Sequence, residues 1–275
     1  MPKTFPICVL VIAALGAAPA FAQTSGDAQL SPQQFYGPPR DLGHPEARTY
    51  RFQSEWRMPQ KSIAAFAAEL EKSVVPVLKK LMQQGTVTDY GTFSTLVLEE
   101  EGPTNGYWFG IPTYAALPKA REALAKAPPS ALAGSALKQH DYFLRHELRL
   151  TKPNRGTSGF YYFNSTLIQP GKQGQWREWW DRYQKPLYER FLADGLIASY
   201  EIDEGEMHTM DPNLQYLIWV ATSGEALDKM NDAWIARAKR QSAEEKREMA
   251  AGLAAVVVAG SHRDYFADAP SYGNR

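Results

Sequence analysis

The chain has almost no cysteine, and several other absences limit its possible functions. Its 275 residues include one cysteine, Cys8, which lies in an early apolar stretch. The rest of the chain therefore has no disulfide, no thiol nucleophile and no thiolate metal ligand. Basic and acidic residues number 30 each. Nucleic-acid-binding domains usually have a basic excess, so the sequence predicts no nucleic-acid partner.

Motifs of common catalytic and metal centres are also missing. The sequence contains no G-x-S-x-G, no H-E-x-x-H and no phosphate-binding loop. The run Met207-His208-Thr209-Met210 could recruit copper, but so short a ligand set is weak support for a metal site. We therefore expect neither a metal nor a cofactor, and no motif identifies a reaction.

The first 22 residues have the pattern of a secretory signal peptide. Lys3 precedes an apolar stretch at 7–18, and Ala20-Phe21-Ala22 fits the A-x-A cleavage pattern. The stretch is shorter than the ~20 residues of a membrane-spanning helix, although an N-terminal anchor is the alternative. We expect cleavage after Ala22 and a periplasmic or extracellular protein with no membrane span in the mature chain. Removal of Lys3 leaves a net charge of −1.

One pattern occurs twice in the remaining chain, with a constant spacing of 110 residues. The matching pairs include Phe66 and Trp176, Pro76 and Pro186, Gly85 and Gly195, Tyr90 and Tyr200, and Leu117 and Leu227. The tripeptide Asp-Tyr-Phe also occurs twice, at 141–143 and 264–266, with an offset of 123. A register this constant predicts an internal duplication, with about thirteen residues added in the second copy.

Each copy predicts the order strand, helix, strand, strand, helix, strand. In the first copy, alternating apolar residues predict a strand at 49–58. Spacings of three and four predict a helix at 63–81, which Pro76 should kink or divide. The remaining elements are expected at 87–98, 107–111, 117–126 and 142–150. In the second copy they are expected at 160–168, 173–193, 197–202, 213–222, 224–239 and 265–272, with an additional helix at 242–259.

The domain organisation follows from these elements. We expect an extended arm at 23–48, a first repeat at 49–151, a linker at 152–159 and a second repeat at 160–275. Two ferredoxin-like βαββαβ units in tandem resemble the dimeric α+β barrel superfamily over most of residues 49–270. The resemblance implies an α+β fold in which the two repeats pack sheet to sheet as a pseudo-dimeric barrel. Members include cofactor-independent monooxygenases and heme-handling enzymes, so the fold leaves the function open.

Candidate ligand-binding residues lie on the first and fourth strands, which the resemblance places side by side. Polar side chains share one side of each strand: Arg51, Gln53, Glu55 and Arg57 on the first, and Arg145, Glu147 and Arg149 on the fourth. If the two sides coincide, the arginines could hold a carboxylate or phosphate group. The alternative is a solvated sheet face, or salt bridges between the repeats.

The second copy has aromatic residues at the matching positions. Tyr161 and Phe163 replace Arg51 and Gln53, and a charged half facing an aromatic half would form an amphipathic cavity. Alternatively, both faces of the strand at 160–168 are core. The candidate binding residues are therefore Arg51, Arg57, Arg145, Tyr161 and Phe163.

A role in proton transfer needs an acceptor in the cavity, and Glu55, His146 and Glu147 are the candidates. His146 shares its parity with Leu144 and Leu148, which favours a position in the helix-covered core. The main hypothesis is a secreted or periplasmic protein that binds a small organic ligand between its repeats. The alternatives are a cofactor-independent oxygenase, isomerase or lyase on an aromatic or polyketide-like substrate, and a structural protein without a ligand. A monomer and a homodimer both fit, because the two repeats can cover each other.

Overall fold

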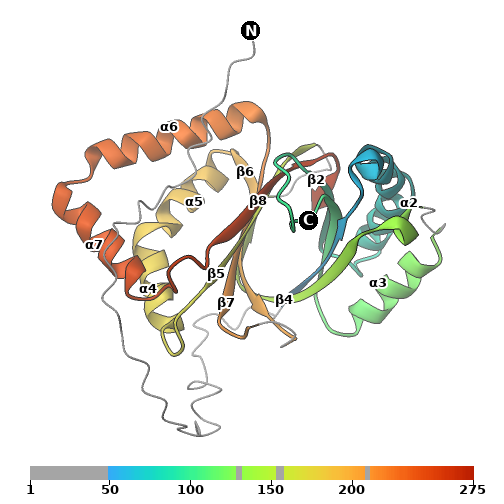
Figure 1. Ribbon diagram of the computed structural model, residues 1–275, viewed down its shortest axis with the longest axis horizontal. Helices are drawn as coiled ribbons and strands as arrows, with labels where there is room; N and C mark the ends of the chain where they lie inside the picture. The colour runs from blue at the N-terminus through green and yellow to red at the C-terminus, as the bar shows by residue number, and fades with distance from the viewer. Residues whose placement is uncertain (1–48, 128–131, 153–157, 208–210) are drawn as a thin grey trace, which may run out of the picture. The chain divides into compact units, whose positions relative to one another are not determined.

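Eight antiparallel strands close into a barrel, and helices cover its outside (Figure 1). The computed structural model describes residues 49–127, 132–152, 158–207 and 211–275, so the predicted signal peptide and arm lie outside it. The first half contains β1 (Tyr50–Arg57), η1 (Gln60–Ser62), α2 (Ile63–Gln83), β2 (Asp89–Thr95), β3 (Asn105–Ile111), α3 (Ala116–Ala125), η2 (Ala133–Ser135) and β4 (Lys138–Thr151). The second half contains β5 (Gly159–Leu167), α4 (Gln173–Tyr183), α5 (Lys185–Ala193), β6 (Ile197–Gly205), β7 (Leu214–Ala221), α6 (Gly224–Arg240), α7 (Ala243–Ala254), β8 (Arg263–Ala269) and β9 (Tyr272–Asn274).

The strand pairing explains how the barrel closes. β1 pairs with β3 and β4, and β2 pairs with β3, which gives the order β4-β1-β3-β2. The second half has the equivalent order β8-β5-β7-β6. The two sheets then join along two edges, β4 with β6 and β2 with β8, while β9 pairs with β2. The predicted α+β class and barrel architecture are confirmed.

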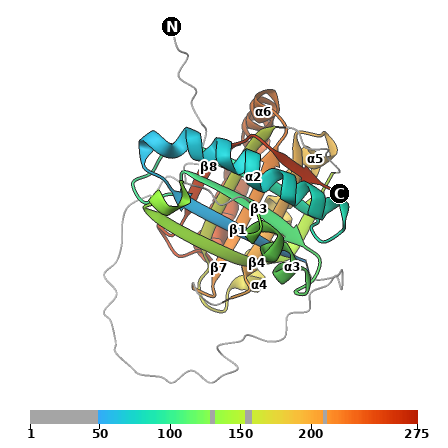
Figure 2. The ribbon, with the colours of Figure 1, turned by 90° about the vertical axis from the view of Figure 1, so that its right-hand side faces the viewer.

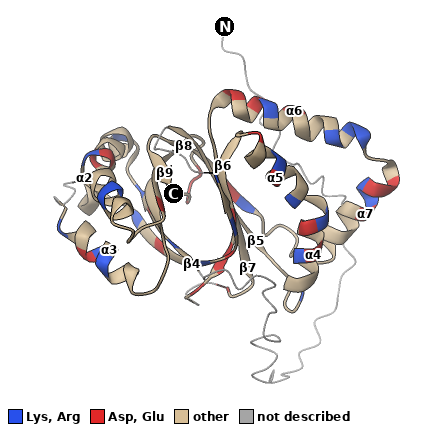
Figure 3. Ribbon diagram, turned by 180° about the vertical axis from the view of Figure 1, so that it is seen from behind, with Lys and Arg blue, Asp and Glu red and all other residues tan. Residues whose placement is uncertain are grey.

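The helices cover two sides of the barrel. α2 packs on β2 and β3 of the first half, and Figure 2 shows α2 and α3 in front of that half's strands. Helices α4 to α7 lie on the side of the second half (Figure 1). Basic and acidic residues are interspersed along α2, α3 and α6 (Figure 3), as is typical of solvated helix surfaces. No helix within the described ranges is long and apolar enough to cross a membrane.

Side-chain alternation sorts the residues of each strand between two environments. On β1, Tyr50 and Phe52 pack beneath the helices with Leu78 and Phe109. In the second half, the corresponding layer includes Trp176, Trp180, Tyr188, Tyr200 and Trp219. A third apolar cluster lies inside the barrel and contains residues of both halves, among them Phe93, Trp108, Leu144, Tyr161, Phe163, Tyr216 and Tyr272. The two sheets therefore share one interior.

The two matching prolines have different effects on their helices. α2 continues through Pro76 as one helix of 21 residues. The segment predicted as one helix at 173–193 is instead divided at Gln184, and Pro186 lies in the first turn of α5. A proline is tolerated there because the first-turn N–H groups lack helical partners in any case.

A glycine on β2 allows the interior aromatic packing. A Cβ at Gly91 would overlap the ring of Trp108, which in turn stacks on Tyr161 with centroids 4.4 Å apart. We expect Gly91→Ala to lower the free energy of unfolding by about 1–3 kcal/mol, because the ring has to move within a filled core. Chemical denaturation measures this change. Gly134→Ala is the control, since its Cβ would meet nothing within 4 Å, and equal stabilities would contradict the packing argument.

Candidate functional site

A buried ion cluster lies where β4 pairs with β6. The Nη2 and Nε atoms of Arg51 donate to Glu201 Oε2 at 2.7 and 2.9 Å. Arg149 donates to Asp89 at 2.8 Å and lies 3.4 Å from Glu201. His146 Nδ1 lies 2.7 Å from Asp203 Oδ1. We call these residues the seam cluster: Arg51, Asp89, His146, Arg149, Glu201 and Asp203.

The charges of the seam cluster stabilise one another. Burial raises the pKa of Glu201, but Arg51, His146 and Arg149 outweigh this effect and hold the pKa at about 2. Burial lowers the pKa of His146, but Asp203 and Glu201 outweigh burial and raise it above its ordinary value. Burial raises the pKa of Asp203 above its ordinary value, and His146 and Arg51 offset only part of this effect. When His146 is protonated, three cations face the three carboxyl groups, which offsets part of the cost of burying them.

Three members of this cluster also have the donor atoms of a metal site. One ligand atom from each of His146, Glu201 and Asp203 lies within 4.8 Å of the others. However, Glu201 already accepts hydrogen bonds from Arg51 and Arg149. A divalent cation here would lie beside two guanidinium groups, so we interpret the cluster as a structural ion network. His208 and Met210, which belong to the run considered for copper binding, lie outside the described residues.

A pocket of about 250 Å³ opens at one end of the barrel, between the two halves. It is formed by the last residues of β1, β2 and β5, the first residues of β8, part of β4 and the loop after β2. Phe163 packs against Tyr265 and Tyr142, with centroids 5.2 and 5.5 Å away. We call this site the mouth pocket; its lining includes Glu55, Val97, Glu99, Glu101, Tyr142, Phe163, Ser165, Arg263, Asp264 and Tyr265.

Glu55 is a buried acidic residue of the mouth pocket, with 6% of its surface exposed. Tyr265 Oη and Gln53 Nε2 both donate to Glu55 Oε1 at 2.7 Å. Tyr161 Oη donates in turn to Gln53 Oε1 at 2.5 Å. Burial raises the pKa of Glu55 to about 7, although hydrogen bonds from Tyr265, Gln53 and Tyr142 lower it. The carboxyl group therefore exchanges a proton near neutral pH, as a general acid or base does.

The structure brings together only part of the predicted site. Glu55 and Phe163 line the mouth pocket, and Tyr161 lies behind it, hydrogen-bonded to Gln53. Arg57 lies 3.8 Å from Glu101 of the pocket lining. Arg51 belongs to the seam cluster instead, where Glu201 occupies its guanidinium group.

The polar side chains of β1 and β4 do not all lie on the same face of the sheet. The register places Arg51 opposite Leu144 and Tyr50 opposite Arg145, so Arg145 faces outward. There Arg145 pairs with Glu204 and Glu206 at 3.3 and 3.0 Å. Glu147 lies 3.9 Å from Arg177 of α4.

The predicted position of His146 in the helix-covered core is wrong. A β-bulge between His146 and Leu148 reverses the alternation of side chains. His146, before the bulge, faces the barrel interior on the same side as Leu144, which packs in the interior cluster. Leu148, after the bulge, packs with the apolar cluster beneath the second-half helices. The same reversal turns Arg149 toward Asp89 and Glu201.

Sequence reasoning missed Tyr142 and Tyr265, which both hydrogen-bond to Glu55. A signal for them was present, because each is the tyrosine of a repeated Asp-Tyr-Phe tripeptide. It also missed the carboxylates of Glu201 and Asp203, which lie at positions that match Gly91 and Phe93 of the first copy. No repeated pattern marks those two residues.

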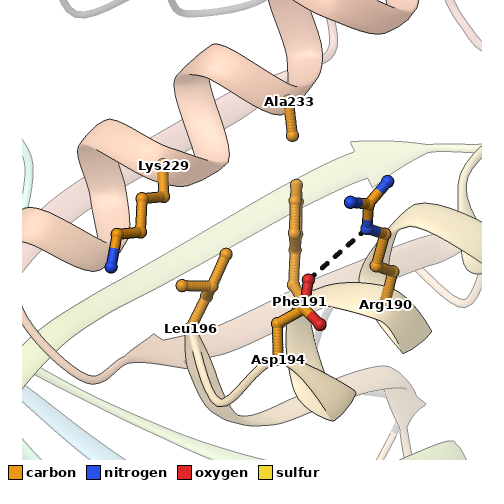
Figure 4. Close-up of a pocket in the computed structure, with 6 residues that line it drawn as sticks. All are labelled: Arg190, Phe191, Asp194, Leu196, Lys229 and Ala233. Carbon is orange, nitrogen blue, oxygen red and sulfur yellow. Dashed lines mark hydrogen bonds and ion pairs between the residues drawn. The ribbon is translucent and has the colours of Figure 1, made fainter.

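A second pocket, of about 280 Å³, lies on the outside between α5 and α6 (Figure 4). Phe191 and Leu196 lie between Lys229 on one side and Arg190 on the other. Arg190 and Asp194 form an ion pair of 3.4 Å, and both side chains are mostly exposed. An exposed pair contributes at most ~1 kcal/mol. Because the polar groups of this pocket are solvated, it is a weaker candidate than the mouth pocket.

Comparisons with known proteins identify the fold. No family model and no curated protein matches the sequence. Similar solved structures include a proposed monooxygenase from Lactobacillus acidophilus, with a TM-score of 0.57, 11% identity and coverage of 83% of this chain and 97% of that one. A proposed monooxygenase from Fusobacterium nucleatum has a TM-score of 0.55 and 10% identity, and the match covers 83% of this chain and 95% of that one. An anthrone oxidase-like protein has a TM-score of 0.51 and 12% identity, and the match covers 84% of this chain and 94% of that one. These likenesses show the dimeric α+β barrel fold that the order of elements predicted.

The pair of His146 and Asp203 makes stability depend on pH. The pKa of His146 is raised above its ordinary value of 6.5 in the folded state, so its contribution is complete below about pH 6.5 and is lost as the pH rises through the folded pKa. We expect wild type to lose stability over this range relative to the double variant His146→Gln/Asp203→Asn. Denaturant titrations over a pH series measure the difference. The exposed His262→Gln is the control, and a difference that does not change with pH would contradict the assignment.

Proposed function

We propose that this protein binds a small organic molecule in the mouth pocket, with Glu55 as its polar anchor. The observation that carries the proposal is a carboxyl group with a pKa of about 7 at a pocket shared by both halves. A buried carboxyl group without a cationic partner is costly to ionise. Such groups concentrate at functional sites.

The size and lining of the pocket define the ligand. Its volume of about 250 Å³ is slightly below the ~300–1,000 Å³ of drug-sized sites, which favours a ligand built on about one aromatic ring. Tyr142, Phe163 and Tyr265 contribute aromatic side chains to this lining. Deeper in the barrel, residues such as Trp108 and Tyr161 are buried and stacked, so the ligand binds at the mouth.

The polar anchor differs from the arginines considered from the sequence alone. Arg51 is bound to Glu201 and Arg145 faces outward, so neither is available in the pocket. Glu55 instead offers a carboxyl group that donates a hydrogen bond when protonated and accepts one when ionised.

The same group supports a second candidate function, cofactor-independent catalysis. An acid with a pKa near 7 is suited to remove a proton from an acidic O–H or C–H group of a bound substrate. Gln53 and Tyr265 would hold the carboxylate in place. The likeness to proteins described as monooxygenases and as anthrone oxidase-like is compatible with this function.

A thermal-shift screen of one-ring aromatic compounds tests ligand binding. We expect some compounds to raise the melting temperature of wild type and to lose this effect in Glu55→Gln and Phe163→Ala, because both residues line the pocket. Lys229→Ala, which alters the pocket between α5 and α6, is the matched control. The proposal fails if no compound stabilises wild type, or if Lys229→Ala abolishes the stabilisation instead.

The ionisation of Glu55 can be followed without a ligand. Its pKa rises from 4.5 to about 7 on folding, so the folded state binds the extra proton and stability falls as the pH rises from about 4.5 to about 7. We expect wild type to lose on the order of 3 kcal/mol over this range relative to Glu55→Gln. Denaturation at several pH values measures the loss. Parallel curves for the two proteins would show that Glu55 is not perturbed, and Glu99→Gln at the exposed rim controls for surface charge.

Secretion is also part of the proposal, on the basis of the signal-peptide pattern at 1–22. Expression of the full chain should yield an exported protein whose first residue is Gln23, because the A-x-A site ends at Ala22. N-terminal sequencing of the exported fraction checks this. Retention of an uncleaved chain in the membrane would favour the anchor instead.

A further inference from the structure

The lining of the mouth pocket is strongly acidic. Four acidic residues contribute to it: Glu55, Glu99, Glu101 and Asp264. The carboxylate of Asp264 accepts a hydrogen bond from Tyr162 at 2.9 Å. Of the described residues that line it, Arg263 has the one basic side chain, and its Nη1 donates to the carbonyls of Gly260 and His262 at 2.8 and 2.7 Å. Arg57 lies 3.8 Å from Glu101, but that carboxylate is 80% exposed, so water weakens the pair. Acidic residues therefore outnumber basic ones in the lining of the pocket.

Its walls are aromatic as well as acidic. Phe163 packs between Tyr142 and Tyr265, and Tyr265 also donates its hydroxyl hydrogen to Glu55. The face of an aromatic ring carries partial negative charge and attracts cations, most strongly where water is excluded. Rings and carboxyl groups at the same pocket are the combination that recognises ammonium ligands.

We propose that the mouth pocket selects small organic cations, such as primary or quaternary ammonium compounds that carry an aromatic ring. Their ammonium group approaches Glu55. This inference rests on the proposed function, because it assumes that the pocket binds a ligand. The proposal excludes an anionic ligand, which arginines at this site would have favoured.

The surroundings of Glu55 determine how such binding depends on pH. The groups that face it are Gln53 of β1, His140, Tyr142 and Lys138 of β4, Tyr161 of β5, Tyr216 of β7 and Tyr265 of β8. Of the groups that shift the pKa of Glu55, Lys138 has the smallest effect, which lowers that pKa. Burial lowers the pKa of the half-buried His140. A bound cation would add positive charge beside Glu55 and favour its ionised form. Binding should therefore release a proton and tighten as the pH rises through about 7.

Isothermal titration calorimetry with three probes of similar shape tests the charge preference. The probes are 2-phenylethylammonium, neutral 2-phenylethanol and anionic phenylacetate. We expect the cation to bind at least about tenfold more tightly than the alcohol, the effect of a partly desolvated cation–π contact, and the anion to bind most weakly. Tighter or equal binding of the alcohol, lost in Phe163→Ala, would overturn the inference but leave the proposed function intact. Binding of none of the probes would overturn both.

Benzyltrimethylammonium, whose charge does not change with pH, isolates the contribution of Glu55. Its affinity for wild type should rise about tenfold between about pH 6 and pH 8, as a carboxyl group with a pKa near 7 ionises. In Glu55→Gln the affinity should be lower and independent of pH. Glu248→Gln, on the exposed face of α7, should match wild type. A wild-type affinity that stays constant with pH, or is unchanged in Glu55→Gln, would overturn the inference.

Discussion

The barrel depends on the buried ion cluster that joins β4 to β6. Arg51, His146 and Arg149 of the first half meet Glu201 and Asp203 of the second half at distances from 2.7 to 3.9 Å. The first half alone would keep only the pair of Arg149 and Asp89, and the second half alone would leave Glu201 and Asp203 without these cations. A lone buried charge is strongly destabilising. The cations and carboxylates of this edge therefore favour pairing of unlike halves.

The same cluster explains why Glu55 is unusual. Arg51 and Glu55 lie on one side of β1, and both are buried in the barrel interior. The guanidinium group of Arg51 is occupied by Glu201, and the nearest partners of Glu55 are the neutral groups of Tyr265 and Gln53. Neutral hydrogen bonds offset only part of the desolvation cost of a carboxylate. The strand β1 thus contributes Arg51 to the seam cluster and also carries Glu55, whose pKa is raised.

The sequence predicted the order of elements and the barrel because periodicity and the 110-residue register are local or repeated signals. It also predicted that Arg51 and Glu55 share a side of β1. It failed for His146, because the side that His146 shares with Leu144 is the barrel interior and not the helix-covered face. Leu148 appeared to share this side only because a bulge leaves no mark on the pattern. The acidic lining also escaped prediction, since Glu99 and Asp264 meet only after the barrel closes.

The two halves of the barrel have an equivalent strand order but different side chains at the mouth pocket. Glu55 and Ser165 occupy matching positions of the two copies, and both line the mouth pocket. An assembly of two identical chains would place either two acids or two hydroxyls there, and a guest molecule could bind equally in two opposite directions. The single polypeptide instead places one acid and one hydroxyl in the lining of the same pocket, so the chemistry of the pocket is not symmetric.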